Sequence, residues 1–412
     1  MTSASEAVVA RARVRGPFPL LGPAFVASIA YVDPGNFATN IAAGSKYGYL
    51  LVWVLLASNL MAMLIQYLSA KSGIATGATL PELCRTHFSQ PTVTGLWLQA
   101  EIVAIATDVA EVLGGALALK LLFGLPLVAG GVVTAVVAFV LLGVQGRGHR
   151  PFETAIVGLL AVILVGFLYS LVAGGVDPMS VAEGAVPRFS GSESLLIAAG
   201  MLGATVMPHA IYLHGALTNE RYVADTAEQR SALLRSQRVD VVTAMSLAGL
   251  VNLAMLVIAA RLFFGREPAV DTIEKAHERL NSALGPTAAL LFALALLASG
   301  LASSSVGTFA GQIIMQGFLR RRVPLLVRRL VTLSPALLVL ALGVDTTQAL
   351  VISQVVLSFG IAFALVPLVL LTRRVDVMGT LVNRQVTTVV ASLVAAVIIV
   401  MNVILLVFTA LA

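Results

Sequence analysis

The hydrophobic residues of this chain gather into eleven long runs separated by short polar segments. An α-helix needs about 20 apolar residues to cross the hydrocarbon core of a bilayer, whereas a membrane barrel shows shorter, alternating stretches. The pattern therefore predicts an all-α integral membrane protein. The predicted spans are approximately residues 18–43, 48–71, 93–120, 125–144, 152–173, 193–217, 238–261, 284–317, 325–343, 347–371 and 386–410.

Two of these runs are interrupted near their centres by a proline and polar side chains. The first run contains Asp33-Pro34-Gly35-Asn36, and the sixth contains Met207-Pro208-His209. Because proline lacks a backbone donor and clashes with the preceding turn, we expect both helices to break there. An ionisable residue such as Asp33 is costly inside a membrane and usually functional.

The positions of the two breaks predict an internal symmetry. The broken spans are the first and the sixth, so the second set of five spans enters the membrane with the opposite orientation. Discontinuous helices in corresponding positions of two inverted repeats are typical of secondary transporters, which build a substrate site near the bilayer midplane. We predict one membrane domain over residues 1–412, with repeats at about 18–173 and 193–371 and an added helix at about 386–410.

The composition agrees with a membrane protein and argues against other classes. The chain is 58% hydrophobic and 11% charged, whereas soluble domains have about 45–50% apolar and about 25% charged residues. The net charge of +6 is spread over short loops and does not indicate nucleic-acid binding. A single cysteine, Cys84, excludes a disulfide framework and a Cys-based metal cluster. Without a phosphate-binding loop or a His-Glu-x-x-His motif, we expect no nucleotide, no cofactor and no enzymatic activity.

The Lys and Arg residues predict the orientation in the membrane. With a cytoplasmic N-terminus, all but seven of the 26 fall on the cytoplasmic side, beginning with Arg11, Arg13 and Arg15. The seven on the other side are Lys46, Lys120, Arg188, Arg261, Arg266, Lys275 and Arg279. We therefore predict a multi-pass protein of the cell (inner) membrane, with its C-terminus outside and no cleaved signal peptide.

Side chains at the two breaks can bind a metal ion. Asp33 and Asn36 are three positions apart and offer carboxylate and amide oxygens, which suit a divalent cation. Met207 offers a soft thioether, which favours transition metals over Mg²⁺ or Ca²⁺. Two structural alternatives stay open. Asp33 could instead cap the following half-helix while Asn36 pairs with freed backbone groups, and Met207 could fill the core.

Backbone oxygens and a further amide extend this ligand set. Unwinding frees the carbonyls of Ala30 and Ala204 to act as ligands. Gln354 is an amide in an otherwise apolar span, and it is either a ligand that joins when the site closes or an interhelical hydrogen bond. One carboxylate, one sulfur and several neutral oxygens suit borderline ions such as Mn²⁺ or Fe²⁺.

Three acids lie on one face of the third span. At 100° per residue, Glu101 and Asp108 differ by about 20°, and Asp108 and Glu111 differ by about 60°. Because acids facing lipid are costly, this face lines a proton pathway or meets basic partners in a static ion-pair network. The candidate partners are Arg328, Arg329 and Arg221.

Two histidines follow the second break. Histidine titrates near physiological pH, so it can relay protons, and it can also bind a metal. We predict a functional role for His209. For His214, a place in the proton pathway and a hydrogen-bonded buried side chain stay equally open.

Several motifs of this chain occur together in one known family. They are Asp33-Pro34-Gly35-Asn36, Gly203-Ala204-Thr205-Val206-Met207-Pro208-His209, Gln99-Ala100-Glu101, Asp108-x-x-Glu111, Arg328-Arg329 and Ser353-Gln354. With them the chain resembles the Nramp (natural resistance-associated macrophage protein) transporters over essentially its whole length, and looks closest to the bacterial manganese-import branch. The resemblance implies a LeuT-like five-plus-five inverted-repeat fold with helices 1 and 6 broken.

The resemblance also implies a function, the proton-coupled import of Mn²⁺ and Fe²⁺, with Co²⁺, Cd²⁺ and Zn²⁺ as further substrates. By motif, the implied metal ligands are Asp33, Asn36, Met207 and the Ala204 carbonyl, joined in some states by Ala30 and Gln354. The implied proton path starts at Asp33 and uses His209, Glu111, Asp108, Glu101, Arg328, Arg329 and Arg221. One departure is Ala210, where many relatives have Asn. The alternatives are a sodium- or proton-coupled carrier of organic solutes on the same fold, a cation channel, and a membrane metalloenzyme.

Overall fold

A computed structural model describes residues 22–145, 149–222, 226–267, 269–321 and 324–411 of the chain. The start of the first predicted span and the basic residues Arg11, Arg13, Arg15, Arg147 and Arg322 lie outside these residues. The regular structure of the described residues is helical throughout.

Both predicted breaks are present. The first span consists of α2 (Pro23–Ser28), the 3-10 turn η1 (Ile29–Val32) and, after Asp33, α3 (Pro34–Tyr47). The sixth span consists of α10 (Gly191–Thr205) and α11 (Pro208–Arg221). Each second half-helix begins at the proline, which fits this position because its missing N–H would have no intrahelical partner there.

The other predicted spans are continuous helices. Within the described residues, eight helical stretches are long and apolar enough to cross a membrane, the joined α10 and α11 among them. The broken first span and two shorter helices, α7 and α15, correspond to the remaining predictions. The continuous helices are α4 (Val52–Thr76), α6 (Gln90–Phe123), α7 (Leu127–Gln145), α8 (His149–Gly174), α12 (Ala227–Leu262), α14 (Pro286–Leu319), α15 (Leu325–Ala341), α16 (Thr346–Thr372) and α18 (Gln385–Leu411).

The seventh span begins earlier than its hydrophobic run predicts. Helix α12 starts at Ala227 rather than near residue 238, because Thr226 and Gln229 form a capping box that starts the helix in the polar segment. The first three turns of α12 therefore lie before its apolar run, which places Arg238 where the polar and apolar parts meet.

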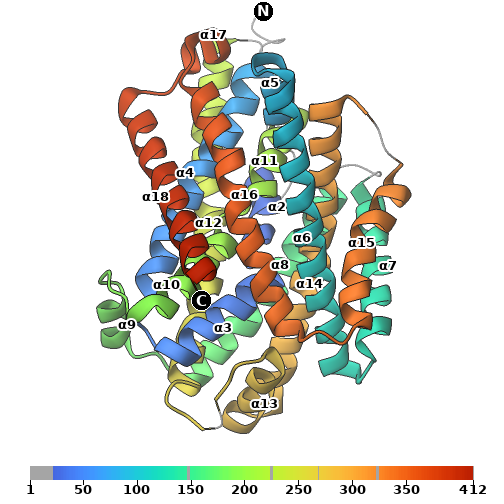
Figure 1. Cartoon of the computed structure of the whole chain (residues 1–412), viewed down its shortest axis with the longest axis vertical. Helices are drawn as coiled ribbons and strands as arrows, with labels where there is room; N and C mark the ends of the chain where they lie inside the picture. The colour runs from blue at the N-terminus through green and yellow to red at the C-terminus, as the bar shows by residue number, and fades with distance from the viewer. Residues whose placement is uncertain (1–21, 146–148, 223–225, 268, 322–323, 412) are drawn as a thin grey trace, which may run out of the picture.

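Short helices between the spans were not predicted from the hydrophobic pattern, because they are too short to cross a bilayer. They are α5 (Leu80–His87), α9 (Pro178–Gly184), α13 (Ile273–Leu284), α17 (Val375–Met378) and the 3-10 turn η2 (Gly379–Leu381). Helices α9 and α13 lie at one end of the bundle, and α5 and α17 lie at the other (Figure 1).

Helix α14 packs closely along α6, α8 and α7 at the centre of the bundle. A Cβ at Gly300 would lie 2.9 Å from the Gly115 nitrogen, and one at Gly311 would lie 2.2 Å from the Arg328 guanidinium. Small residues allow helices in a membrane to approach this closely. Helix α14 thereby holds α6 beside the first break.

Candidate metal site

The first break exposes backbone carbonyls, and neighbouring helices bind them. Asp33 is extended (φ −74°, ψ 169°), as expected for a residue before proline, and it caps α3 by accepting the Asn36 N–H at 2.8 Å. The Val32 carbonyl accepts the Ser299 hydroxyl at 2.6 Å, and the Tyr31 carbonyl accepts the Asn252 amide at 2.7 Å. The break is therefore a stable feature of the fold.

The second break lies at Val206 and Met207, both of which leave the helical conformation (ψ 85° and 119°). Pro208 then starts α11, and no side chain caps this half-helix. Ala204 and Met207, on the two sides of the break, are fully buried.

The two breaks meet through one amide group. The Asn36 Nδ2 donates to Asp33 Oδ1 at 2.7 Å and to the Ala204 carbonyl at 2.9 Å. From α16, the Gln354 Nε2 lies 3.4 Å from Asp33 Oδ2. Gly35 makes room for it, since a Cβ there would lie 1.7 Å from the Gln354 nitrogen. We call Asp33, Asn36, Ala204 and Gln354 the break cluster.

The break cluster contains oxygens without partners. Asn36 Oδ1 and Gln354 Oε1 are buried and accept no hydrogen bond in the described part of the chain. A buried acceptor left unpaired costs about 1–3 kcal/mol. A cation placed among these oxygens would relieve that cost, so the donor set fits a metal ion that loses its water.

The remaining predicted ligands lie at the same breaks. Ala30 is buried within η1, three residues before Asp33, and Met207 is buried at the start of α11. No hydrogen bond links either residue to Asp33 among the described residues. The described residues also contain no group of three or more His, Cys, Asp or Glu side chains suited to a metal, so a metal here would depend on the mixed donors of the two breaks.

The acids of α6 do meet arginines of α15. Arg328 binds Glu101 through two hydrogen bonds of 3.1 Å, and Arg329 binds Asp108 at 2.9 Å. Both arginines are almost fully buried. We call these two pairs the carboxylate–arginine ladder.

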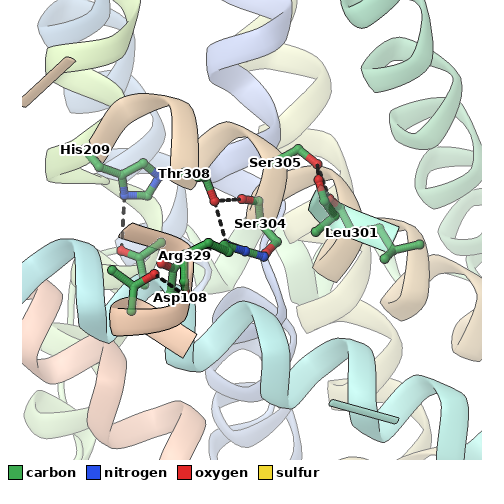
Figure 2. Close-up of polar contacts among 10 residues, drawn as sticks. Asp108, His209, Leu301, Ser304, Ser305, Thr308 and Arg329 are labelled. Carbon is green, nitrogen blue, oxygen red and sulfur yellow. Dashed lines mark hydrogen bonds and ion pairs between the residues drawn. The ribbon is translucent and has the colours of Figure 1, made fainter. Parts of the chain in front are cut away.

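The ladder draws on hydroxyl groups of α14 as well. Arg329 donates to Ser304 and Thr308, each at 2.5 Å, and Figure 2 shows its guanidinium between these hydroxyls and Asp108. The role of Ser304 depends on its position opposite Arg329, which the sequence alone does not contain.

Glu111 lies between the ladder and the break cluster. It is fully buried, and neither carboxylate oxygen makes a hydrogen bond of good geometry within the described part of the chain. A Cβ at Gly307 would lie 3.0 Å from one of these oxygens, so α14 covers the carboxylate. One turn further along α6, Gly114 packs against Pro34 of the first break, since a Cβ added at Gly114 would lie 2.1 Å from the Pro34 Cβ.

The two histidines have different surroundings. His209 is fully buried, its Nδ1 lies 3.3 Å from the Thr107 hydroxyl, and its Nε2 has no partner among the described residues. Thr107 precedes Asp108, so His209 lies beside the ladder (Figure 2). His214 instead belongs to another chain of hydrogen bonds, in which Gln66 joins its Nδ1 at 2.8 Å to the Tyr31 hydroxyl at 2.5 Å.

The expected pairing of Arg221 with the α6 acids is wrong. Arg221 lies at the end of α11 and forms an ion pair with Glu153 of α8. Glu153, Thr107 and Gln66 are polar residues that the sequence analysis missed. Their signal, a polar side chain within or at the end of an apolar run, was present but does not identify a partner.

Comparison with known proteins gives a consistent result. The family model described as natural resistance-associated macrophage protein-like matches residues 24–408. The divalent metal cation transporter MntH of Bacillus subtilis is 52% identical over 396 residues, which cover 96% of this chain and 93% of that protein. The MntH of Deinococcus radiodurans is 54% identical over 391 residues, covering 94% and 89%.

Solved structures agree with the sequence relatives. A mutant of the manganese transporter of Eremococcus coleocola superposes with a TM-score of 0.85 at 32% identity, over 95% of this chain and 88% of that one. The predicted LeuT-like all-α fold with two broken helices is thereby confirmed. The match of the family model over nearly the whole chain, with relatives more than half identical in sequence, shows that this chain belongs to the Nramp family.

Proposed function

We propose that this chain is a secondary transporter that imports divalent transition metals together with protons, with Mn²⁺ and Fe²⁺ as its main substrates. The observation that carries the proposal is the break cluster, in which a buried carboxylate lies with the Ala204 carbonyl and with two amide oxygens that have no hydrogen-bond partner among the described residues. The relatives with more than 50% identity are named divalent metal cation transporters, and none is named an enzyme.

The donor set supports a borderline metal. Asp33 supplies the charge, Asn36 and Ala204 supply neutral oxygens, and Gln354 is near enough to join them. In this structure the Asn36 nitrogen faces the oxygens of Asp33 and Ala204, so rotation of that amide would bring its oxygen toward a cation. The Met207 thioether adds a soft donor, which Mg²⁺ and Ca²⁺ do not favour. Co²⁺, Cd²⁺ and Zn²⁺ are then further substrates.

The buried polar groups support a proton route beside the metal route. A dication bound at Asp33 favours its deprotonation, and the proton moves to His209 or Glu111, which keep unpaired atoms. From there it continues along Asp108 and Glu101 of the ladder. His214 lies apart from this route, at the end of the hydrogen-bond chain through Gln66.

Transport follows alternating access across the cell (inner) membrane. The two broken helices move against the scaffold of α6, α8 and α14, first opening the break cluster to the outside and then to the cytoplasm. The N-terminus is cytoplasmic and the C-terminus lies outside. Six of the cations predicted for the outer side lie in the last turn of α3, after α9, at or after the end of α12, or in α13. Helices α9 and α13 lie at one end of the bundle (Figure 1), which supports this orientation.

Uptake into proteoliposomes tests the proposal, with internal pH followed at the same time. Wild type should show saturable Mn²⁺ entry and internal acidification, and Asp33→Ala should lose both. Glu278→Ala, which removes an exposed acid on α13, is the matched control and should transport normally. Mn²⁺ entry without acidification would reject proton coupling, and the absence of Mn²⁺ entry in wild type would favour the organic-solute carrier.

A further inference from the structure

Three basic residues gather at one end of α4, α12 and α18. The Lys71 Nζ donates to Asn383 Oδ1 at 2.8 Å, and Arg384 is the next residue of the chain. The Arg238 guanidinium lies over the Tyr67 ring, 5.4 Å from its centroid, and Tyr67 is one turn before Lys71 on α4. Because α4 contacts both α12 and α18, the three cations form one basic site.

This basic site has no counterion of its own. Among the described residues, no carboxylate lies within 4.0 Å of a Lys71, Arg238 or Arg384 nitrogen. Asp376, eight residues before Arg384 in the chain, is paired with Arg374. The charged groups that act most strongly on Lys71 are Arg238 and Arg384, which repel it.

The three cations also differ in access to solvent. Lys71 is 7% exposed, whereas Arg238 and Arg384 lie on the surface. A buried cation that faces two others and no acid is costly in a folded protein. A bound anion would offset this repulsion and could reach the site from the surface.

The surface beside the basic site is apolar. On α18, Val386, Val389 and Leu393 begin just after Arg384 and are 73%, 50% and 60% exposed. On α12, Val239 and Val242 follow Arg238 and are also exposed. A free phosphate ion would gain nothing from this surface, but the acyl chains of a phospholipid would cover it.

We propose that Lys71, Arg238 and Arg384 bind the phosphate of an anionic phospholipid, whose acyl chains lie along the exposed apolar faces of α12 and α18. Basic pockets between membrane-spanning helices suit such headgroups. The proposal does not depend on the transported metal, and it assigns the lipid to the end of the bundle where α17 lies (Figure 1).

Native mass spectrometry of the full chain in detergent tests this site, with phosphatidylglycerol as the anionic probe and phosphatidylcholine as the zwitterionic one. The variant is Arg238→Gln/Arg384→Gln, which changes two exposed side chains and leaves buried Lys71 in place. Each cation near a lipid surface changes affinity about fivefold, so the double variant should bind phosphatidylglycerol about 25-fold more weakly. Phosphatidylcholine should bind both proteins weakly and equally.

Two controls separate charge from other effects. Arg188→Gln/Arg266→Gln removes two exposed cations at the opposite end of the bundle and should leave binding within about twofold of wild type, because screening confines each charge to a range of about 10 Å. Arg238→Lys/Arg384→Lys keeps both charges and should retain binding. Equal affinity of wild type and the Gln double variant for phosphatidylglycerol would overturn the proposal. Displacement of the lipid by an equal concentration of inorganic phosphate would also overturn it, since the site would then bind a free ion.

Discussion

The break cluster and the carboxylate–arginine ladder are both buried polar groups in one bundle, yet they satisfy their atoms differently. In the ladder, each acid faces an arginine at 2.9–3.1 Å, and serine and threonine hydroxyls complete the network. Among the described residues, the carboxylate of Asp33 in the break cluster has only amide partners, and two amide oxygens have none.

The paired groups of the ladder stabilise the fold, whereas the unpaired oxygens of the break cluster can still bind a substrate ion. A paired network has already offset the cost of burying its charges, so removing one member leaves the other unpaired. An incompletely satisfied site keeps a cost that only a ligand removes. Substitutions in the ladder should therefore impair stability as well as the proton route, whereas substitutions in the break cluster should impair transport without a loss of stability.

The largest effect on transport is expected from Asp33→Asn. The change keeps the size of the side chain and removes the only charge of the break cluster, a loss of about 3 kcal/mol or roughly 100-fold in Mn²⁺ uptake. Stability should not fall, because Asp33 has no ion-pair partner among the described residues. Initial uptake rates and thermal unfolding in detergent measure both. Uptake within threefold of wild type would show that the carboxylate does not bind the metal.

Arg329→Met tests the opposite case in the ladder. It leaves Asp108 buried without its cation and removes the bonds to Ser304 and Thr308, so stability should fall by about 3–5 kcal/mol. Thermal unfolding in detergent is the measurement. The double variant Asp108→Asn/Arg329→Met should recover part of the loss of stability, since it no longer leaves a buried carboxylate without a cation. An unfolding midpoint equal to wild type would mean that water already solvates Asp108.

The sequence alone was enough to predict the local features of these two regions, but not the contacts between their helices. The breaks were predictable because Asp33 and Met207 each precede a proline, and proline acts locally on the backbone. The shared face of Glu101, Asp108 and Glu111 followed from helical geometry alone. Local rules of this kind need no knowledge of how helices pack.

Pairings between helices depend on the register of their packing, which a single sequence does not contain. The sequence offered three arginines for the α6 acids, and Arg221 proved to pair with Glu153 on α8. Similarly, no local pattern predicts that Asp240 accepts the N–H groups of Gly22 and Ala24 at 3.2 and 3.1 Å and so caps α2 from another helix.

Met207→Ala tests whether the thioether beside the break cluster contributes to metal selectivity. Mn²⁺ uptake should persist through the oxygen donors, while discrimination against Ca²⁺ should relax by roughly tenfold, equal to about 1.4 kcal/mol of lost preference. Competition of Ca²⁺ with Mn²⁺ uptake in liposomes gives this value. Met201→Ala, another buried methionine near the second break, is the control for cavity formation and should keep selectivity. Unchanged selectivity in Met207→Ala would remove its sulfur from the site.

The smallest effect is expected from Thr107→Val, at the place where the two regions adjoin. The substitution nearly keeps the volume and removes the hydroxyl that lies 3.3 Å from His209 Nδ1. One neutral hydrogen bond contributes about 0.5–1.5 kcal/mol, so proton flux should slow by about two- to tenfold. Mn²⁺ binding should not change, because among the described residues Thr107 makes no hydrogen bond to the break cluster's oxygens. Since His209 Nε2 has no partner among the described residues, this one bond orients the ring, and the variant should lower the ratio of protons to metal ions carried. Equal slowing of both fluxes, which leaves their ratio unchanged, would instead indicate a general packing defect, and two fluxes equal to those of wild type would place His209 outside the proton route.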